Sequence, residues 1–333
     1  MACNSNQKLI LTQEFPELSY FELEGYQLHF GKNAWKTIVS VIFQVPKILT
    51  KINRENRWLR RFLAENKVDL VFSDNRYGFH SDQKPSIFIT HQLAIRSGIH
   101  RRVDLLLQRL NYRYINRFTN CWVPDYADGP NLAGELSHPS NKPAIACEYI
   151  GALSRFEATT TNTPGSFVLI ILSGPEPQRS ILENRILSEI AHLTGRFVLV
   201  RGLPGISQVP SLPKNIEVHN HLPAAKLNQL MCNCSFVISR AGYTSIMDYF
   251  KTNARAILIP TPGQAEQEYL AAFHHRQQSA MSVNQEDFSI EGALKSASVF
   301  PFENKNWDMD RYKQVIDDLL LKHVAGTLKH ARV

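Results

Sequence analysis

Short apolar runs recur along the second half of the chain, and stretches with helical periodicity separate them. The runs, each followed by polar or turn residues, are "SFVLIILSG" (166–174), "RFVLVRG" (196–202), "IEVHNHL" (216–222), "SFVISR" (235–240) and "RAILIP" (255–260). The expected helices cover residues 179–194, 224–232, 244–252 and 264–276. Buried parallel strands are apolar along their length because helices cover both faces of their sheet. The pattern therefore predicts an α/β domain with a mostly parallel sheet.

The first half shows the same alternation. Its strand-like runs are Leu9–Leu11, Tyr20–Leu23, "VDLVFSD" (68–74), "PSIFITH" (85–91) and "NCWVPD" (120–125). Residues 35–65 and 101–117 are amphipathic and predict helices, the first of them kinked or divided by Pro46. Residues 151–165 are rich in Thr, Gly and Pro and have no period, so we place a linker there. We expect two Rossmann-like domains with parallel sheets, residues 1–150 and 166–333.

Composition is that of a soluble globular protein, with 44% hydrophobic and 20% charged residues among 333. No apolar stretch of about 18 residues and no signal sequence is visible, so we expect a cytoplasmic protein. The five cysteines are scattered, and Cys232 and Cys234 are too close for a CxxC pair, which favours reduced structural thiols. The net charge of +7 fits an anionic partner. No RNP, KH or zinc-finger pattern favours nucleic acid.

In open parallel sheets ligands bind outside the carboxyl ends of the strands, so the residues after each apolar run are candidate ligands. In "LSGPEPQRS", Ser173 and Gly174 follow a strand and Arg179 opens a helix. Glycine allows close backbone approach, helix-initial N–H groups attract anions, and Arg179 adds a fixed charge with bidentate reach. The segment fits a diphosphate site and, equally, an ordinary strand-to-helix turn capped by serine.

The segment "SRAGYTSIMD" offers a second set of small residues between a strand and a helix. They are Ser239, Gly242, Thr244 and Ser245. Small side chains leave backbone amides and hydroxyls available to a phosphate. Asp248 comes one helical turn after Thr244, on the same face, and a carboxylate there accepts both hydrogen bonds of a ribose diol. The structural alternative is that Asp248 complements the helix dipole, which contributes about 0.3–1 kcal/mol.

The segment "IPTPGQAEQEYLAA" supplies a third set, Gln264, Gln267 and Glu268, on the first turns of the next helix. Amides and carboxylates at these positions suit neutral ligands rich in hydroxyl groups, such as sugars. Taken alone they also fit the usual polarity of a helix N-terminus. The three segments together predict a nucleotide-sugar pocket.

The motifs "SRAGYTSIMD" and "PTPGQAEQEYLAA" resemble the donor site of GT-B nucleotide-sugar glycosyltransferases of family 28, whose best-known member transfers N-acetylglucosamine to a lipid-linked peptidoglycan precursor. The resemblance implies that Asp248 holds the ribose, residues 239–244 with Arg240 among them the diphosphate, and Gln267 with Glu268 the donor sugar. Asp248 replaces the family's usual Glu, and Glu268 replaces a second Gln. The resemblance implies no metal and no other cofactor, because helix N-termini and Arg179 would neutralise the leaving diphosphate.

The first half resembles a MurG-like subgroup of these enzymes through "SDNRYGFH" (73–80), "ITHQL" (90–94), "WVPD" (122–125) and "YIGALSRF" (149–156). Its "DNRYG" is also similar to a nucleotide-sugar hydrolase of the same fold. The family's first strand leads into a glycine-rich loop that carries a His, and no GxGH is present here. The resemblance therefore implies a GT-B arrangement whose N-terminal domain lacks its first βα unit, which leaves activity open.

Four polar residues follow the strands of the first half. His91 and Asp74 are candidate catalytic residues, because histidine side chains in general accept a proton near neutral pH and both residues follow strands. The alternative for His91 is a structural histidine. Asn75 and Arg76 would position the hydroxyl of the acceptor, or else form a local salt-bridged turn.

Residues 96–117 combine arginines with leucines and tyrosines. Such a basic amphipathic segment is typical of a helix that lies on an anionic membrane, which suits a lipid-linked acceptor and a peripheral position on the inner face of the membrane. The plainer interpretation is a surface helix with one buried face.

The prediction is a glycosyltransferase that moves a hexose or N-acetylhexosamine from a UDP-linked sugar to a possibly lipid-linked acceptor. The two alternatives are a nucleotide-sugar hydrolase and a catalytically inactive nucleotide-sugar-binding protein.

Overall fold

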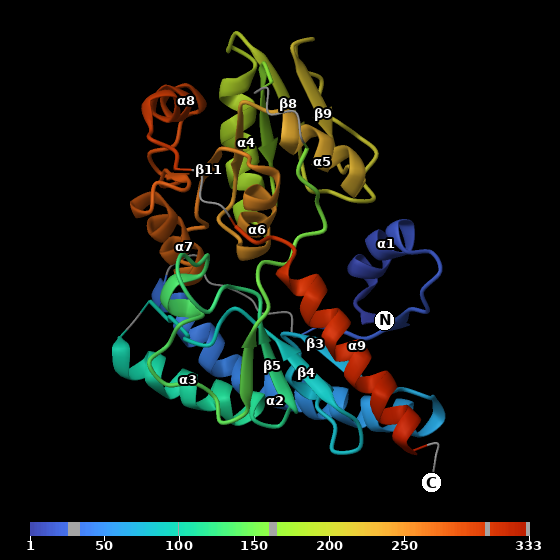
Figure 1. The fold of residues 1–333 in the computed structure, drawn as a ribbon. Helices are drawn as coiled ribbons and strands as arrows, with labels where there is room; N and C mark the ends of the chain where they lie inside the picture. The colour runs from blue at the N-terminus through green and yellow to red at the C-terminus, as the bar shows by residue number, and fades with distance from the viewer. Residues whose placement is uncertain (26–33, 99, 160–164, 304–306, 331–333) are drawn as a thin grey trace. The chain divides into compact units, whose positions relative to one another are not determined.

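The computed structural model describes residues 1–25, 34–98, 100–159, 165–303 and 307–330 (Figure 1). The chain forms two compact units, each built from two stretches of sequence. The first unit combines Met1–Lys51 with Arg155–Lys305, and the second combines Ile52–Ser154 with Asn306–Val333. Part of the expected linker, residues 160–164, lies outside the described residues. The domain bounds expected from the sequence stay a prediction.

The first unit contains a sheet of six parallel strands. They are β7 (Phe167–Ile171), β8 (Arg196–Val200), β9 (Ile216–His219), β10 (Phe236–Ser239), β11 (Ala256–Leu258) and β12 (Met281–Ser282). Their order across the sheet is β12-β11-β10-β7-β8-β9, and all neighbours pair in parallel. The helices that join them are α4 (Gln178–Ile190), α5 (Ala224–Asn233), α6 (Tyr243–Thr252), α7 (Ala265–Arg276) and α8 (Ile290–Val299). This is the doubly wound topology that the alternating apolar runs predict.

The core of this unit lies between the sheet and helices α4 and α8. Ile186 of α4 and Ile290 of α8 are fully buried against Ile170 and Ile257 of the central strands. Burying one such side chain contributes about 1.5–3 kcal/mol to folding. The packing fixes where the strands end, and therefore where the polar segments after them begin.

The N-terminal stretch forms a small βαβ element with strands β1 (Ala2–Cys3) and β2 (Phe21–Glu22) around helix α1 (Ser5–Glu14). The strand-like interpretation of Leu9–Leu11 is wrong, because these residues lie within α1. A capping box between Asn4 and Gln7 starts that helix. Helix α2 (Ala34–Glu65) contains Pro46 in its interior, so Pro46 does not divide it.

The second unit contains a sheet of four parallel strands in the order β3-β4-β5-β6. They are β3 (Val71–Asp74), β4 (Ser86–Ile89), β5 (Asn120–Val123) and β6 (Ala146–Tyr149). Helix α3 (Arg101–Ile115) joins β4 to β5, and short 3-10 helices cover Tyr77–Phe79 and Gly134–Leu136. Helix α9 (Arg311–His330) packs Val315, Ile316 and Leu319 against Ile87 and Trp122 of the sheet. The predicted α/β class with parallel sheets is confirmed.

Candidate functional site

The three predicted ligand segments of the first unit leave neighbouring strands at the same edge of the sheet. Strand β10 pairs in parallel with β7 on one side and with β11 on the other. The chain continues from β7 to β8 in one direction and returns to β10 in the other, so the strand order reverses between β7 and β10. Ligands of open α/β sheets bind at such a reversal, outside the carboxyl ends of the strands.

The side chain of Arg240 connects these three segments. Its Nη1 atom donates to the carbonyl oxygens of Ile259 and Pro260, both at 3.3 Å, and its Nη2 atom donates to the carbonyl of Gln178 at 2.7 Å. Arg240 follows β10, the first two acceptors follow β11, and Gln178 begins α4. Arg240 is 1% exposed, so its side chain lies beneath the segments and fixes their spacing.

Arg240 is a buried cation without a counter-ion in the described part of the chain. Its hydrogen-bond acceptors are carbonyl groups, and its Nε atom is buried without a partner among those residues. Burial lowers the pKa of Arg240 to about 10, so the side chain is still charged at neutral pH. An isolated buried charge costs several kcal/mol. A bound anion at the segments above it would offset that cost.

Helix α6 begins beside Arg240 and has no side-chain cap. Its N-cap residue is Gly242, with extended backbone angles of φ −74° and ψ 140°. The helix is ten residues long, so its dipole and its first N–H groups favour an anion at this end. Thr244 is exposed and Ser245 is half-buried in the first turn. Ser239 is buried, and its hydroxyl donates to the carbonyl of Arg240 at 3.0 Å.

Asp248 lies one turn along α6 from Thr244, as the sequence predicts, and is 9% exposed. The helix spans Tyr243–Thr252, which matches the expected bounds to within one residue. The role of Asp248 as acceptor for a ribose diol stays a prediction.

The third segment is held by its own polar side chains. The Oε1 atom of Gln267 accepts hydrogen bonds from the backbone N–H and the hydroxyl of Thr261, both at 3.0 Å, and its Nε2 atom donates to Gln264 at 2.6 Å. Glu268 accepts from the backbone N–H of Gly263 at 2.8 Å, where φ is +79° and glycine is favoured. Gln264, Gln267 and Glu268 therefore come together at one turn. Their contact with a donor sugar stays a prediction.

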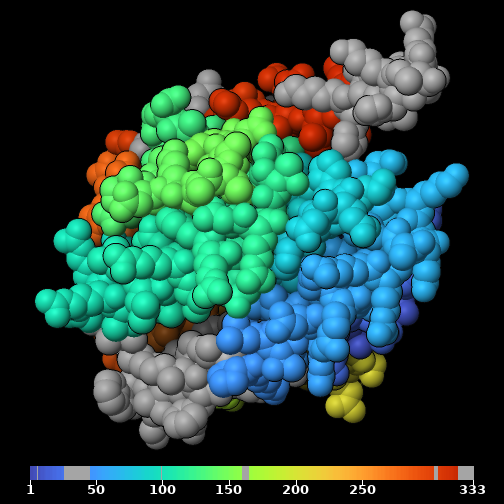
Figure 2. Space-filling model, turned by 90° about the horizontal axis from the view of Figure 1, so that it is seen from below, coloured from blue at the N-terminus to red at the C-terminus, as the bar shows by residue number. Residues whose placement is uncertain are grey.

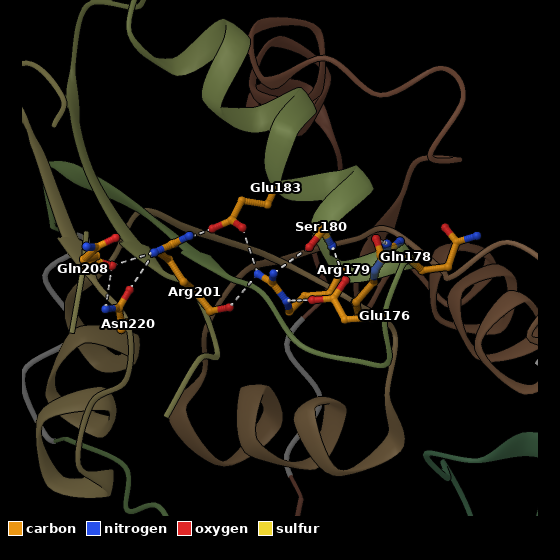
Figure 3. Close-up of polar contacts among 9 residues, drawn as sticks. Glu176, Gln178, Arg179, Ser180, Glu183, Arg201, Gln208 and Asn220 are labelled. Carbon is orange, nitrogen blue, oxygen red and sulfur yellow. Dashed lines mark hydrogen bonds and ion pairs between the residues drawn. The ribbon is translucent and has the colours of Figure 1, made fainter. Parts of the chain in front are cut away.

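Arg179 belongs to a network of ion pairs that runs across the ends of β7, β8 and β9 (Figure 3). Its guanidinium donates to Glu176 at 2.7 Å and to Glu183 at 3.0 Å, and Glu183 also pairs with Arg201. Arg201 continues the network by donating to Asn220 at 2.8 Å. Burial raises the pKa of Glu183, but the two arginines outweigh this effect and lower it.

The charge of Arg179 is therefore balanced by two carboxylates, unlike that of Arg240. Glu176 also accepts from the backbone N–H of Ser180 at 3.2 Å, so a carboxylate caps the start of α4 where the sequence suggested a serine. Ser173 and Gly174 lie exposed at the head of this turn, and Gly174 has φ +100°. The turn fits the structural alternative for Arg179. Its role in neutralising a diphosphate stays a prediction.

In the second unit, the candidate catalytic residues Asp74 and His91 interact. Asp74 is the last residue of β3 and pairs with Ile89 of β4. His91 follows Ile89 by two residues, so it leaves the sheet beside Asp74. Desolvation by the surrounding protein raises the pKa of Asp74, and the nearby charge of His91 opposes that rise. The arrangement suits a general base, and this role stays a prediction.

Arg76 forms a buried ion pair with a glutamate of helix α2, and both predicted alternatives for Arg76, a contact with the acceptor and a local salt-bridged turn, stay predictions. Its Nε and Nη2 atoms donate to Oε1 of Glu55 on α2, at 2.9 and 2.7 Å, and Glu55 is 2% exposed. Asn75 has φ +52°, a left-handed conformation that asparagine tolerates better than most residues. Its amide donates to Asp74 at 3.4 Å. Asn75 and Arg76 thus shape the turn that presents Asp74.

Asn111 of helix α3 holds the loop that carries His91, a role that sequence analysis missed. Its amide donates to the carbonyl of Gln92 at 3.1 Å and accepts from the hydroxyl of Tyr77 at 2.7 Å. Burial raises the pKa of Tyr77 to about 12, so this hydroxyl remains a donor. A buried polar residue within an amphipathic helix was the available signal, because such a group requires partners.

Part of the first unit matches a known protein family. Residues 182–300 match the glycosyltransferase family 28 C-terminal domain. The match contains β10, α6, β11 and α7, and therefore the segments around Arg240, Asp248 and Gln267. The predicted resemblance to family 28 is confirmed. No curated protein matches the sequence.

Several solved structures with a similar fold are GT-B glycosyltransferases. The kitacinnamycin glycotransferase has a TM-score of 0.58 at 15% identity, over 89% of this chain and 81% of its own. UGT2 of Phytolacca americana, complexed with UDP-2fluoro-glucose and pterostilbene, has a TM-score of 0.55 at 12% identity, over 93% and 82%. Spinosyn rhamnosyltransferase SpnG, complexed with thymidine diphosphate, has a TM-score of 0.54 at 14% identity, over 87% and 83%. These likenesses confirm the GT-B fold class.

Among the described residues, no helix is both long enough and apolar enough to cross a bilayer.

Proposed function

We propose that the protein is a glycosyltransferase that moves a hexose or N-acetylhexosamine from a UDP-linked sugar to an acceptor hydroxyl. The observation that carries the proposal is the buried, unbalanced charge of Arg240 beside the uncapped start of α6. Both features favour an anion at the reversal of strand order, where ligands of this topology bind. The match of residues 182–300 to family 28 supports a sugar donor's diphosphate as that anion.

The proposed roles follow the positions of the side chains. Arg240 and the first turn of α6, with Thr244 and Ser245, hold the diphosphate. Asp248 accepts from the ribose, and the turn of Gln264, Gln267 and Glu268 contacts the sugar. Negative charge that develops on the leaving diphosphate is stabilised by groups already in place, and this needs no reorganisation during the reaction.

A binding experiment tests the proposal. Uridine diphosphate is expected to raise the melting temperature of the protein, since a ligand that binds only the folded state stabilises it. At 100 times the dissociation constant the gain is about 2.7 kcal/mol. Calorimetric titration should give the same dissociation constant with and without magnesium. Thymidine diphosphate shows whether affinity depends on the base, and uridine shows whether it depends on the diphosphate. The absence of binding by both diphosphates would contradict the proposal.

A turnover assay distinguishes the transferase from its two alternatives, a hydrolase and a nucleotide-sugar-binding protein. A panel of UDP-sugars is incubated with the protein, with and without lipid and sugar acceptors, and released nucleotide and free sugar are measured. A transferase releases nucleotide in proportion to glycosylated acceptor. Free sugar as the main product without an acceptor identifies a hydrolase. Binding without either product identifies a nucleotide-sugar-binding protein.

We further propose that helix α3 docks the protein on an anionic membrane surface. Its outer face exposes Leu105 (44%), Leu106 (66%) and Leu110 (38%). The exposed arginines of the same helix are Arg101, Arg102, Arg109 and Arg113. Figure 2 shows the side of the molecule on which α3, in blue-green, lies at the surface. Leucines flanked by arginines match the apolar interior and the negative head groups of such a membrane.

Leu106→Glu is expected to reduce binding to phosphatidylglycerol vesicles by about tenfold or more, because burying a leucine contributes about 1.5–3 kcal/mol. Arg109→Glu is expected to weaken binding most at low ionic strength and less as salt is added, because salt screens the attraction between the arginine and the head groups. Ile181→Glu on α4 is the matched control, since Ile181 is 47% exposed in the first unit. Cosedimentation measures the bound fraction. Equal binding to phosphatidylcholine vesicles, or equal loss in the control variant, would contradict the docking proposal.

A further inference from the structure

Two cysteines of the second unit lie directly opposite each other on neighbouring strands. Cys121 of β5 pairs with Cys147 of β6 in the register of the sheet, so both side chains project from the same face. Neighbouring strands are about 4.8 Å apart. That spacing falls within the Cα separation of about 4.4–6.8 Å that a disulfide requires. The other cysteines, Cys3, Cys232 and Cys234, are on or beside β1 and α5 of the first unit.

The two thiols differ in burial and therefore in chemistry. Cys121 is fully buried, whereas Cys147 is partly exposed. A hydrogen bond from Cys121 lowers the pKa of the Cys147 thiol, and the charge of Lys142 lowers it further against an opposing effect of burial. The same hydrogen bond and burial raise the pKa of Cys121. Lys142 is held nearby, with its Nζ atom 4.8 Å from the ring centre of Tyr149, two residues after Cys147.

We propose that Cys147 and Cys121 form a modification site for hydroperoxides, in which Cys147 is the attacking thiolate and Cys121 the resolving thiol. Thiolates that are accessible and lie beside a second thiol are the ones that peroxides oxidise reversibly. The geometry of the strand pair supplies both conditions. Nothing in this site depends on a bound nucleotide, so the inference is independent of the proposed transferase activity.

The chemistry balances without any group beyond the peroxide. The sulfur of Cys147 attacks one peroxide oxygen, an S–O bond forms, the O–O bond breaks, and the departing oxygen takes a proton to leave as water or an alcohol. The sulfur of Cys121 then attacks the sulfur of Cys147 and gives up its proton, an S–S bond forms, and the S–O oxygen leaves as water. The cysteine pair is oxidised by two electrons and the peroxide is reduced by two.

The fold accommodates the product because β6 is an edge strand. The sheet order β3-β4-β5-β6 leaves one side of β6 without a neighbouring strand in the described sheet. A small shift of an edge strand toward β5 brings the sulfur atoms together without displacing a further strand. A thiol reductant reverses the reaction and restores both thiols.

The test uses the full chain, hydrogen peroxide as the probe, and peptide mapping after blocking of the remaining thiols. We expect a Cys121–Cys147 disulfide to accumulate, with loss of two hydrogens from the intact mass and recovery on reduction. Cys232 is the internal control, because it is also partly exposed but lies on helix α5 rather than on a strand that pairs with a second cysteine. Cys147 is expected to be oxidised about tenfold faster than Cys232, because a second thiol and the charge of Lys142 lie beside it.

Variants separate the roles of the two thiols. In Cys121→Ala, Cys147 is expected to stop at the sulfenic acid, which dimedone traps. In Cys147→Ser, Cys121 is expected to resist oxidation because it is buried. Lys142→Met, which leaves both thiols in place, should slow oxidation of Cys147. Oxidation of Cys147 no faster than that of Cys232, or a disulfide that joins other cysteines, would overturn the inference.

Discussion

Replacing Arg240 by methionine is expected to weaken the binding of uridine diphosphate by about 100-fold, or about 2.8 kcal/mol. The variant loses the buried charge that no carboxylate of the described residues balances. It also loses the hydrogen bonds that hold Gln178, Ile259 and Pro260 at a fixed spacing around the reversal of strand order. Calorimetric titration measures the dissociation constant, and thermal unfolding shows whether the variant is folded.

Two further variants separate charge from spacing. Arg240→Lys keeps the charge but lacks the planar fork that reaches two separate segments, so we expect it to bind uridine diphosphate with intermediate affinity. Arg255→Met removes an exposed arginine from the same unit and should leave the affinity unchanged. If Arg240→Met is folded and binds as tightly as the unaltered protein, Arg240 is only a structural tie between the three segments.

Arg179→Met is expected to give the opposite result. Its guanidinium pairs with Glu176 and Glu183, so its loss leaves Glu183 buried with Arg201 as the remaining partner. Breaking a buried ion pair typically costs about 3–5 kcal/mol of stability. The melting temperature should therefore fall, while the folded fraction keeps its affinity for uridine diphosphate. A large loss of affinity without loss of stability would restore the role in phosphate binding that the sequence predicts for Arg179.

The difference between these arginines shows what the sequence could establish. Buried parallel strands produce unbroken apolar runs, so β3 to β5 and β7 to β11 match the predicted runs within a few residues, whereas β1, β6 and β12 are not among those runs. The spacing of Arg179 and Glu183, four residues apart on α4, is a recognised signal for a helical ion pair. That spacing by itself favours the structural alternative for Arg179.

Other features depend on tertiary packing and leave little trace in the sequence. Arg76 pairs with Glu55, which lies 21 residues earlier in the sequence, on helix α2. The Arg240 side chain points inward because it donates hydrogen bonds to carbonyl groups of the turn after β11 and of the start of α4. The strand prediction for Leu9–Leu11 is wrong because a run of three apolar residues suits a strand as well as a helix. The capping pair Asn4 and Gln7 just before them was the deciding signal.

His91→Gln is expected to lower kcat by about 10²–10⁴-fold, the usual effect of removing a general base. The KM for the donor should change little, because the proposed donor residues belong to the first unit and His91 to the second. The assay measures nucleotide release with whichever acceptor supports turnover of the unaltered protein. His192→Gln, a change at an exposed histidine after α4, is the matched control.

Asp74→Asn tests whether the two residues act as a unit. Asparagine keeps the shape of the side chain but removes the charge that interacts with His91, so we expect a fall in kcat that is smaller than that of His91→Gln. Residues that act through one another have non-additive effects, so the double variant should be no slower than His91→Gln alone. Additive losses would place Asp74 in direct contact with the substrate. Unchanged kcat in His91→Gln would leave His91 as a structural histidine and move the search for the base to other side chains at the ends of β3 and β4.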